Sequence, residues 1–470
     1  MFDLARADRT ATGLRDFYAG RTRKLDALDL FGRMTERVPA YRAFLADQGV
    51  DPASVAGLGD IPVMTKANYH QRYDLAARCW GGTLSGCDMV AVSSGSSGKP
   101  TVWPRSVLDE RAVAERFEQV FDGGFRAKER TTLAVVCFAL GNWVGGMYTA
   151  DACRHLAAKG YPITVATPGN NVDEILRVVA ELGPLFDQVV LLGYPPFVKN
   201  VIDAGQDWAG RHVKIVLAGE VFSEQWRDLV ATRARMDDPV TDSASLYGTA
   251  DAGVLGNETP LSVRIRRFLA DRPEVATSLF GDSRLPTLVQ YDPGTRLFEV
   301  VDGTLAFSAD GGVPLLRYHI ADEGGLIPHA TMMTICGEQG DKPELPFAYV
   351  FGRSLFTVSF FGANVYPENV TVGLERPHVA DRVTGKFVLR TLEDADRDRK
   401  LSIVVELAPG TLPSDELAAT LAESVRAELL RLNSEFAHYV PAGRQLPEVL
   451  LRAAGDPEFF PPGVKHRYTR

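Results

Sequence analysis

The sequence predicts an α/β protein. We expect a large N-terminal domain with mainly parallel, doubly wound sheets plus a β-rich subdomain, followed by a small α+β domain. The 470 residues are too many for one core, which favours two or three domains. From about residue 88, short apolar runs alternate with amphipathic stretches, a pattern typical of a parallel sheet covered by helices. Around 285–330 this pattern gives way to short strands with Gly and Pro turns, and it changes again after residue 352.

The N-terminal segment, residues 1–60, is expected to be helical because its apolar residues recur near helical spacing. These residues are Leu25, Leu28, Leu30, Phe31 and Met34, followed by Tyr41, Phe44 and Leu45.

Five apolar runs predict the first strands of the large domain: 89–92, 133–138, 163–166, 189–192 and 213–217. An amphipathic helix is expected between two of them, over 172–182. Asn171 is placed to cap it, Glu174 follows three residues later, and Gly183 ends it. Ligands of such sheets bind at the carboxyl ends of the strands, so that edge is where a site is expected.

The later segments predict two smaller groups of strands. The β-rich group comprises 297–300, 304–307 and 315–318, and the C-terminal group comprises 386–390 and 401–407. A long helix capped by Ser414 follows, with one apolar face formed by Leu417, Leu421, Val425 and Leu429. We therefore expect one domain over 1–352 and a small domain over 353–470.

Composition excludes several classes of protein. The formal net charge of -9 argues against a nucleic-acid binder, which needs a basic surface. No apolar stretch reaches the roughly 20 residues that span a bilayer, and the N-terminus lacks a signal-peptide pattern. The cysteines form no CxxC pair and are expected to be free thiols: Cys79, Cys87, Cys137, Cys153 and Cys336. We expect a cytoplasmic monomer or homodimer without nucleic-acid or membrane partners.

A glycine- and serine-rich segment is the most informative part of the chain. It reads Ser93, Ser94, Gly95, Ser96, Ser97, Gly98, Lys99, Pro100, Thr101, and a predicted strand precedes it. Glycine allows backbone to approach a phosphate, hydroxyl groups donate to phosphate oxygens, and the lysine supplies charge. The spacing is not that of a P-loop, which has four residues between its glycines and a Ser or Thr after the lysine. Composition alone also allows a flexible surface loop.

This segment resembles the phosphate-binding loop of the adenylate-forming superfamily, which includes acyl-CoA synthetases, peptide-synthetase adenylation domains and luciferases. The resemblance implies that the loop holds the β- and γ-phosphates of ATP while a carboxylate attacks the α-phosphate. It also implies that residues 1–352 form the adenylation core, with ATP and acyl pockets, and that residues 353–470 form a mobile lid.

Two further segments resemble nucleotide motifs of this superfamily, in the same order along the chain. Gly219 and Glu220, followed by a helix start at 223–227, resemble the segment beside adenine. The run 247–253 resembles the aromatic–Gly–x–x–Glu motif. By this resemblance Tyr247 stacks on adenine, with Gly248 beside it, Thr249 contacts the α-phosphate and Asp251 binds Mg²⁺. Asp251 is one methylene shorter than the usual Glu, but its oxygen suits a hard cation.

The remaining motifs lie further along the chain, after residue 316. The run 317–322 resembles the segment whose aspartate, here Asp322, binds both ribose hydroxyls. Gly352-Arg353-Ser354 and the run 362–367 resemble the hinge motif, in which Arg353 contacts ribose or phosphate. Leu355 stands where that motif usually has Asp or Lys. The family ends in Gly-Lys, and here Lys465 is the candidate for the lysine that catalyses adenylation, although one extra residue precedes it. A frayed basic tail is the alternative.

Within the superfamily the chain looks closest to the phenylacetate–CoA ligases, from the runs 38–42, 61–66 and 138–146. This resemblance implies an acyl pocket lined by Phe138, Asn142, Trp143, Gly145 and Tyr247, and an aromatic or otherwise compact acid. Trp143 can equally serve in core packing.

The combined motifs predict a ligase that uses ATP and Mg²⁺ to convert a carboxylic acid into an acyl-adenylate, with release of pyrophosphate. By resemblance the acyl acceptor is coenzyme A. The alternatives are transfer to an acyl carrier protein, an amine or a hydroxyl. A rival of another class is a degenerate nucleotide-binding protein without turnover.

Overall fold

The computed structural model describes residues 24–93, 101–204, 207–282, 284–337, 344–352, 357–461 and 468–469. These residues form two compact units. The first falls within Met1–Val92, Val102–Gly193 and Val198–Phe351, and the second within Ser93–Thr101, Tyr194–Phe197 and Gly352–Arg470. No helix among the described residues is long and apolar enough to cross a membrane.

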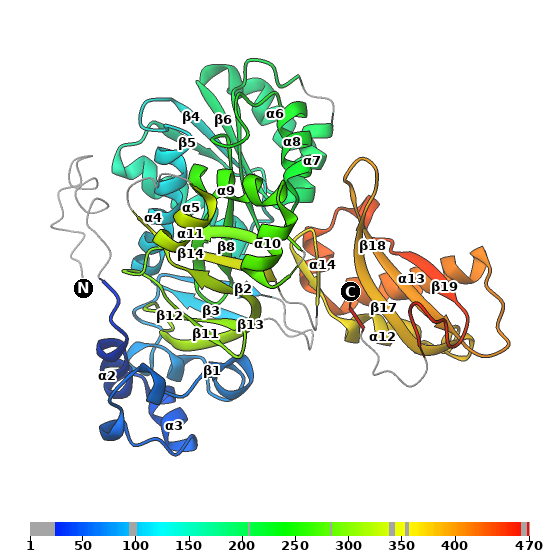
Figure 1. The fold of residues 1–470 in the computed structure, drawn as a ribbon, viewed down its shortest axis with the longest axis horizontal. Coiled ribbons are helices and arrows are strands. Elements are labelled where there is room, and N and C mark those ends of the chain that lie inside the picture. Colours follow the sequence, from blue (N-terminus) through cyan, green and yellow to red (C-terminus); the bar gives the residue numbers. More distant parts are fainter. Residues whose placement is uncertain are drawn as a thin grey trace. The chain divides into compact units, whose positions relative to one another are not determined.

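The first unit is organised around five parallel strands. In spatial order they are β5 (Ile163–Ala166), β4 (Thr132–Val136), β6 (Gln188–Gly193), β7 (Val213–Ala218) and β8 (Ser243–Thr249). The crossover helices are α5 (Val144–Lys159), α6 (Val172–Leu182), α7 (Pro195–Asp203) and α8 (Glu224–Arg233). The chain moves one way from β4 to β5 and the other way from β5 to β8. Because such crossovers are right-handed, α5 covers one face and α6 to α8 the other (Figure 1).

The same sheet continues beyond β8 with strands that are mostly antiparallel. Their order is β9 (Gly253–Asn257), β10 (Thr287–Gln290), β14 (Phe347–Gly352), β13 (Leu315–Ile327), β12 (Thr304–Ala309) and β11 (Leu297–Val301), and β1 (Met64–Thr65) pairs with β13. The predicted β-rich strands are therefore present, but they extend the main sheet, because β9 and β10 join the two groups. Helices α9 (Pro260–Ala270), α10 (Pro273–Phe280) and α11 (His329–Cys336) share a buried apolar cluster with β10 and β14.

The predicted N-terminal helices are confirmed for the described residues. They are α2 (Ala27–Arg37) and α3 (Pro39–Asp47), and residues 1–23 lie outside the described part. Residues after α3 were also expected to be helical, but they form only short 3-10 turns at Pro52–Ser54 and Leu58–Asp60. Proline at the start of the first turn and Gly57 and Gly59 around the second disfavour a longer helix.

The strand before the glycine-rich segment does not join the main sheet. It is β2 (Met89–Ser93), and it forms a two-stranded sheet with β3 (Thr101–Arg105), followed by α4 (Val107–Gly123). The two ends of the glycine-rich segment, Ser93 and Thr101, therefore lie on paired, neighbouring strands.

Two predicted helix caps are present. Asn171 Oδ1 accepts the backbone N–H of Glu174 at 3.1 Å, and Ser414 Oγ accepts that of Leu417 at 3.1 Å. Each cap satisfies an N–H that has no partner within the helix.

The second unit is a small α+β fold. Its elements are β15 (Val358–Phe360), β16 (Ala363–Val365), α12 (Pro367–Leu374), β17 (Val383–Glu393), β18 (Arg399–Leu407), α13 (Asp415–Leu432), α14 (Ser434–Tyr439) and β19 (Glu448–Arg452). β18 pairs antiparallel with β17 and parallel with β19. The predicted apolar face of α13 is buried, and the predicted fold class is thus confirmed.

Close packing of α12 against α13 depends on a glycine. A Cβ added to Gly373 would lie 2.7 Å from the Cα of Val425, and the Gly373 carbonyl accepts a hydrogen bond from Ser424 Oγ at 2.7 Å.

We expect Gly373→Ala to destabilise the second unit by about 1–3 kcal/mol, because the helices must separate. Thermal unfolding followed by circular dichroism measures this. Gly443→Ala is the control, since nothing lies within 4 Å of its added Cβ. Equal melting temperatures for the two variants would contradict the packing argument.

Candidate active site

Several candidate residues of the first unit lie at the carboxyl ends of parallel strands. Phe138 follows β4, Gly219 and Glu220 follow β7, and Thr249 ends β8 just before Asp251. Since the carboxyl ends of parallel strands lie at one edge of a sheet, the topology brings these segments to a common edge. This is the edge at which a ligand site is expected.

Tyr247 and Asp322, which are 75 residues apart in the sequence, are in direct contact. The Tyr247 hydroxyl donates a hydrogen bond of 2.8 Å to Asp322 Oδ2, and both residues are buried. The Tyr247 ring also stacks on Phe298, with ring centroids 6.3 Å apart and planes inclined by 24°. The two residues predicted to bind adenine and ribose are thus neighbours in the fold, and this hydrogen bond orients both side chains.

Two buried arginines, which the sequence analysis missed, hold the turn that carries Asp251. The guanidinium group of Arg105, at the end of β3, donates to the Ala250 carbonyl. Arg296 donates to the Ala252 carbonyl at 3.4 Å. Asp251 is 8% exposed, so its carboxylate lies in a largely enclosed turn braced from both sides. No local sequence pattern marks these arginines, because only the fold brings them to the turn.

The charges around this turn are mostly enclosed. Arg105 Nη1 lies 4.0 Å from Asp109 Oδ1, and its guanidinium lies 5.5 Å from the ring centroid of Tyr148 on α5. Burial lowers the pKa of Arg296. The charge of Asp109 partly offsets this shift, and the charge of Arg105 adds to it.

The connection from β7 to α8 begins with a glycine in a left-handed conformation. Gly219 has φ +85°, which a side chain would disfavour, and it is exposed, whereas Glu220 is buried. Ser223 caps α8 by accepting the N–H of Trp226 at 3.1 Å. The predicted adenine segment is therefore short and closed at both ends by regular structure.

The predicted acyl-pocket residues have different environments. Phe138 is 3% exposed and belongs to the core, whereas Asn142 is exposed. Trp143 and Gly145, at the start of α5, are half-buried. The N–H of Val92 donates to the Asn142 carbonyl at 2.8 Å, so the strand leading to the glycine-rich segment lies beside the start of α5.

Several predicted residues lie outside the described part. They are Ser94, Gly95, Ser96, Ser97, Gly98, Lys99, Arg353 and Lys465, together with the side chain of Ser93. The flanking positions are described: Thr101 begins β3, and Gly352 ends β14 with φ +93°. Gly248 is exposed and Thr249 half-buried; the Thr249 hydroxyl accepts the N–H of Ala252 at 3.1 Å.

The carboxylate of Asp251 is the type of ligand that Mg²⁺ prefers, and one protein carboxylate is enough for such a site. Mg²⁺ is usually held by one or two carboxylates together with substrate phosphates, and it prefers oxygen ligands. A single enclosed carboxylate at the end of β8 provides one such ligand.

The fold is that of the adenylate-forming enzymes. The structure of 2-hydroxyisobutyryl-CoA ligase with 2-HIB-AMP and CoA, in the thioesterification state, matches with a TM-score of 0.65 and 15% identity over 96% of this chain and 91% of that one. An open conformation of the same ligase matches with a TM-score of 0.54 and 14% identity over 96% and 93%.

Sequence comparison adds a likeness to one branch of these enzymes. No protein-family model matches the chain. A phenylacetate-coenzyme A ligase of Thermus thermophilus is 25% identical over 373 residues, which cover 77% of this chain and 76% of the relative. The predicted resemblance to the adenylate-forming superfamily, and within it to the phenylacetate–CoA ligase branch, is confirmed.

The contact between Tyr247 and Asp322 can be tested without a substrate. We expect Tyr247→Phe to lower stability by about 1–3 kcal/mol, because it removes a donor from a buried carboxylate. Thermal unfolding measures the loss. Tyr41→Phe is the matched control, since the buried Tyr41 hydroxyl has no hydrogen-bond partner among the described residues. A melting temperature equally low in both variants would show that the hydrogen bond contributes nothing.

Proposed function

We propose that this protein activates a carboxylic acid with ATP and Mg²⁺ and transfers the acyl group to a thiol, that of coenzyme A. In the first step a carboxylate oxygen attacks the α-phosphorus, and the bond to the β-phosphate oxygen breaks, releasing pyrophosphate. In the second step a thiolate sulfur attacks the acyl carbon, and the bond from that carbon to the AMP oxygen breaks, releasing AMP.

The observation that carries this proposal is the hydrogen bond between Tyr247 and Asp322. Two residues selected from separate motifs, one for adenine and one for ribose, prove to be neighbours in the fold. An aromatic face beside a carboxylate matches an adenosine, because the base stacks and the ribose hydroxyls donate to carboxylate oxygens. The motif spacing and the tertiary contact are independent, and both favour a nucleotide.

The remaining roles are assigned by resemblance. The glycine-rich segment 93–101 would hold the β- and γ-phosphates, and Asp251 would hold Mg²⁺, which neutralises phosphate charge. Arg353 and Lys465 would stabilise charge that develops on the α-phosphate, since this reaction needs electrostatic help more than acid–base help. Residues 353–470 would act as a lid over the core.

The acid is proposed to be aromatic or otherwise compact. A relative is named for phenylacetate, which supports an aryl acid. A structural neighbour is named for the branched 2-hydroxyisobutyryl group, a compact acid. The half-buried Trp143 and the exposed Asn142 supply an apolar surface and a polar handle near the start of α5.

Acid-dependent exchange of pyrophosphate into ATP, with Mg²⁺ and without coenzyme A, tests the first step. The acid panel contains phenylacetate, benzoates, 2-hydroxyisobutyrate and alkyl acids. We expect exchange with one acid class, and thioester formation when coenzyme A is then added. Exchange without thioester formation would indicate that the acyl acceptor is a carrier protein, an amine or a hydroxyl. ATP binding without exchange for any acid would favour a degenerate nucleotide-binding protein.

The lysine assignment has a separate test. We expect Lys465→Ala to lower the exchange rate by about 100-fold or more, because a cation at the reacting phosphate is lost. Arg467→Ala, in the same basic tail, is the control and should retain the wild-type rate. Equal rates in wild type and Lys465→Ala would remove the assignment, and equal losses in both variants would indicate a general effect of the tail's charge.

A further inference from the structure

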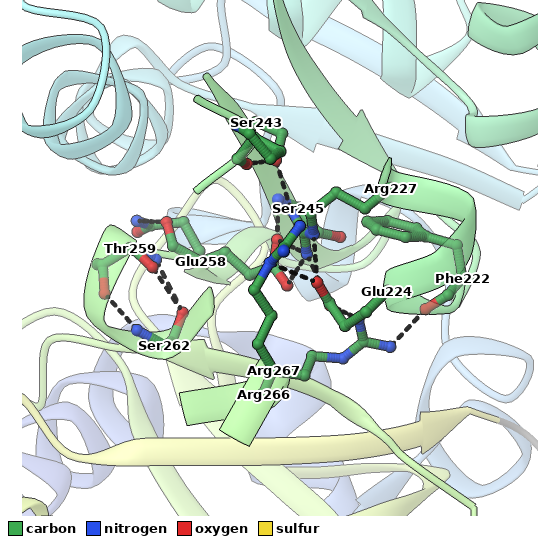
Figure 2. Close-up of polar contacts among 12 residues, drawn as sticks. Phe222, Glu224, Arg227, Ser243, Ser245, Glu258, Thr259, Ser262, Arg266 and Arg267 are labelled. Atoms are coloured by element: carbon green, nitrogen blue, oxygen red, sulfur yellow. Dashed lines mark hydrogen bonds and ion pairs between the residues drawn. The ribbon is translucent and has the colours of Figure 1, made fainter. Parts of the chain in front are cut away.

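A buried network of charges lies directly behind the predicted adenine segment. Figure 2 shows it between the start of α8, strand β8 and helix α9, with side chains pointing toward one another from all three. Its centre is Arg227, which is 0% exposed, and its other buried members are Glu224, Glu258 and Arg266. Arg227 and Glu224 belong to the helix start within the predicted adenine motif, whereas no sequence motif includes Glu258 or Arg266.

Arg227 directs all of its nitrogens at protein acceptors. Its Nε donates to Glu224 Oε2 at 2.9 Å, and its Nη2 donates to Glu258 Oε1 at 2.8 Å. Its Nη1 donates to Ser243 Oγ at 2.6 Å, at the start of β8. One guanidinium group thereby joins helix α8 to strand β8 and to the residue that follows β9.

Arg266, on α9, also bonds to the predicted adenine segment. Its guanidinium donates to the Phe222 carbonyl and to Glu224, and its Nε donates to the Pro286 carbonyl at 2.9 Å. The Phe222 ring also lies under two cations, 5.0 Å from the Arg227 guanidinium and 5.6 Å from that of Arg266. Phe222 stands three residues after Gly219, so its backbone and its ring are both anchored.

Glu258 connects the network to the strand that carries Tyr247. Its Oε2 accepts the backbone N–H of Ser245 at 2.8 Å, two residues before Tyr247 in β8. The connection between β7 and α8 and the aromatic end of β8 are therefore fixed to one rigid group of side chains. These are the two segments expected to contact adenine.

The free energy of burying these charges gives little reason to have such a network for stability alone. Two buried guanidinium groups face two buried carboxylates, and replacing balanced buried pairs with apolar groups often costs little. Burial would raise the pKa of Glu224, but Arg227 and Arg266 lower it and the net shift is downward. Burial would lower the pKa of Arg227, yet Glu258 and Glu224 raise it overall. A fully satisfied network of this kind makes its surroundings rigid and specific.

We propose that the network of Arg227, Glu224, Glu258 and Arg266 is a positioning device that presets the gap between residues 219–222 and Tyr247 for an adenine base. This rests on the proposed nucleotide function. These four residues contact no substrate; they act through the backbone of the β7–α8 connection and of β8. Preorganised backbone lowers the entropy lost on binding and discriminates bases by shape.

The test uses the full-length double variant Arg227→Met/Glu258→Gln. It removes one cation and one anion together, and it leaves an amide oxygen to accept the Ser245 N–H and Arg266 to pair with Glu224. We expect a dissociation constant for ATP about tenfold higher by calorimetry, and an ATP-over-GTP preference about tenfold lower. Without nucleotide, backbone hydrogen exchange of residues 219–223 should be about tenfold faster.

Lys214→Met/Asp242→Asn is the matched control. That pair is equally buried, but it joins the amino end of β7 to the start of β8, away from the adenine segment. It should keep the wild-type base preference whatever its melting temperature. An unchanged base preference and unchanged exchange in the Arg227 double variant would overturn the inference. Failure of the wild type to bind ATP would instead overturn the proposed function, and the inference with it.

Discussion

Parallel strands place all of their carboxyl ends at one edge of a sheet, and the candidate site depends on this constraint. Loops that follow β4, β7 and β8 are separated by many residues in the chain, yet the sheet brings them to a common edge. The connection after β4 runs toward β5, whereas the connection after its neighbour β6 runs the other way, toward β7, so these two loops diverge. The site is assembled from short loops, and short loops keep their conformation only when the structure behind them is rigid.

Buried arginine provides that rigidity. Arg105 and Arg296 hold backbone carbonyls of the turn around Asp251. In the connection before α8, Arg266 holds the Phe222 carbonyl and Arg227 lies over the Phe222 ring. A guanidinium group has five donors in a planar arrangement, so one side chain can join several segments that lack regular hydrogen bonding. Its charge costs free energy to bury, which buried carboxylates such as Asp109, together with Glu224 and Glu258, offset.

The sequence predicted the elements well where local chemistry decides them. The capped helix after Asn171 and the apolar face of α13 are both present, because a cap and a helical repeat are properties of neighbouring residues. It did not predict that β2 leaves the main sheet, or that β11 to β13 join it. Strand pairing is decided by residues far apart in the chain, and one apolar run is compatible with several partners.

For the site, the sequence by itself determined the residue types and their order: an aromatic and a carboxylate at Tyr247 and Asp251, and an aspartate at Asp322. By resemblance, those motifs are predicted to meet a phosphate, a metal and a ribose. Only the tertiary structure decided that the Tyr247 hydroxyl bonds to Asp322 and that Arg227 pairs with Glu258, which accepts the Ser245 N–H. The physical reason is that a buried charge is recognisable only from its partners, and those partners are supplied by the folding of distant segments.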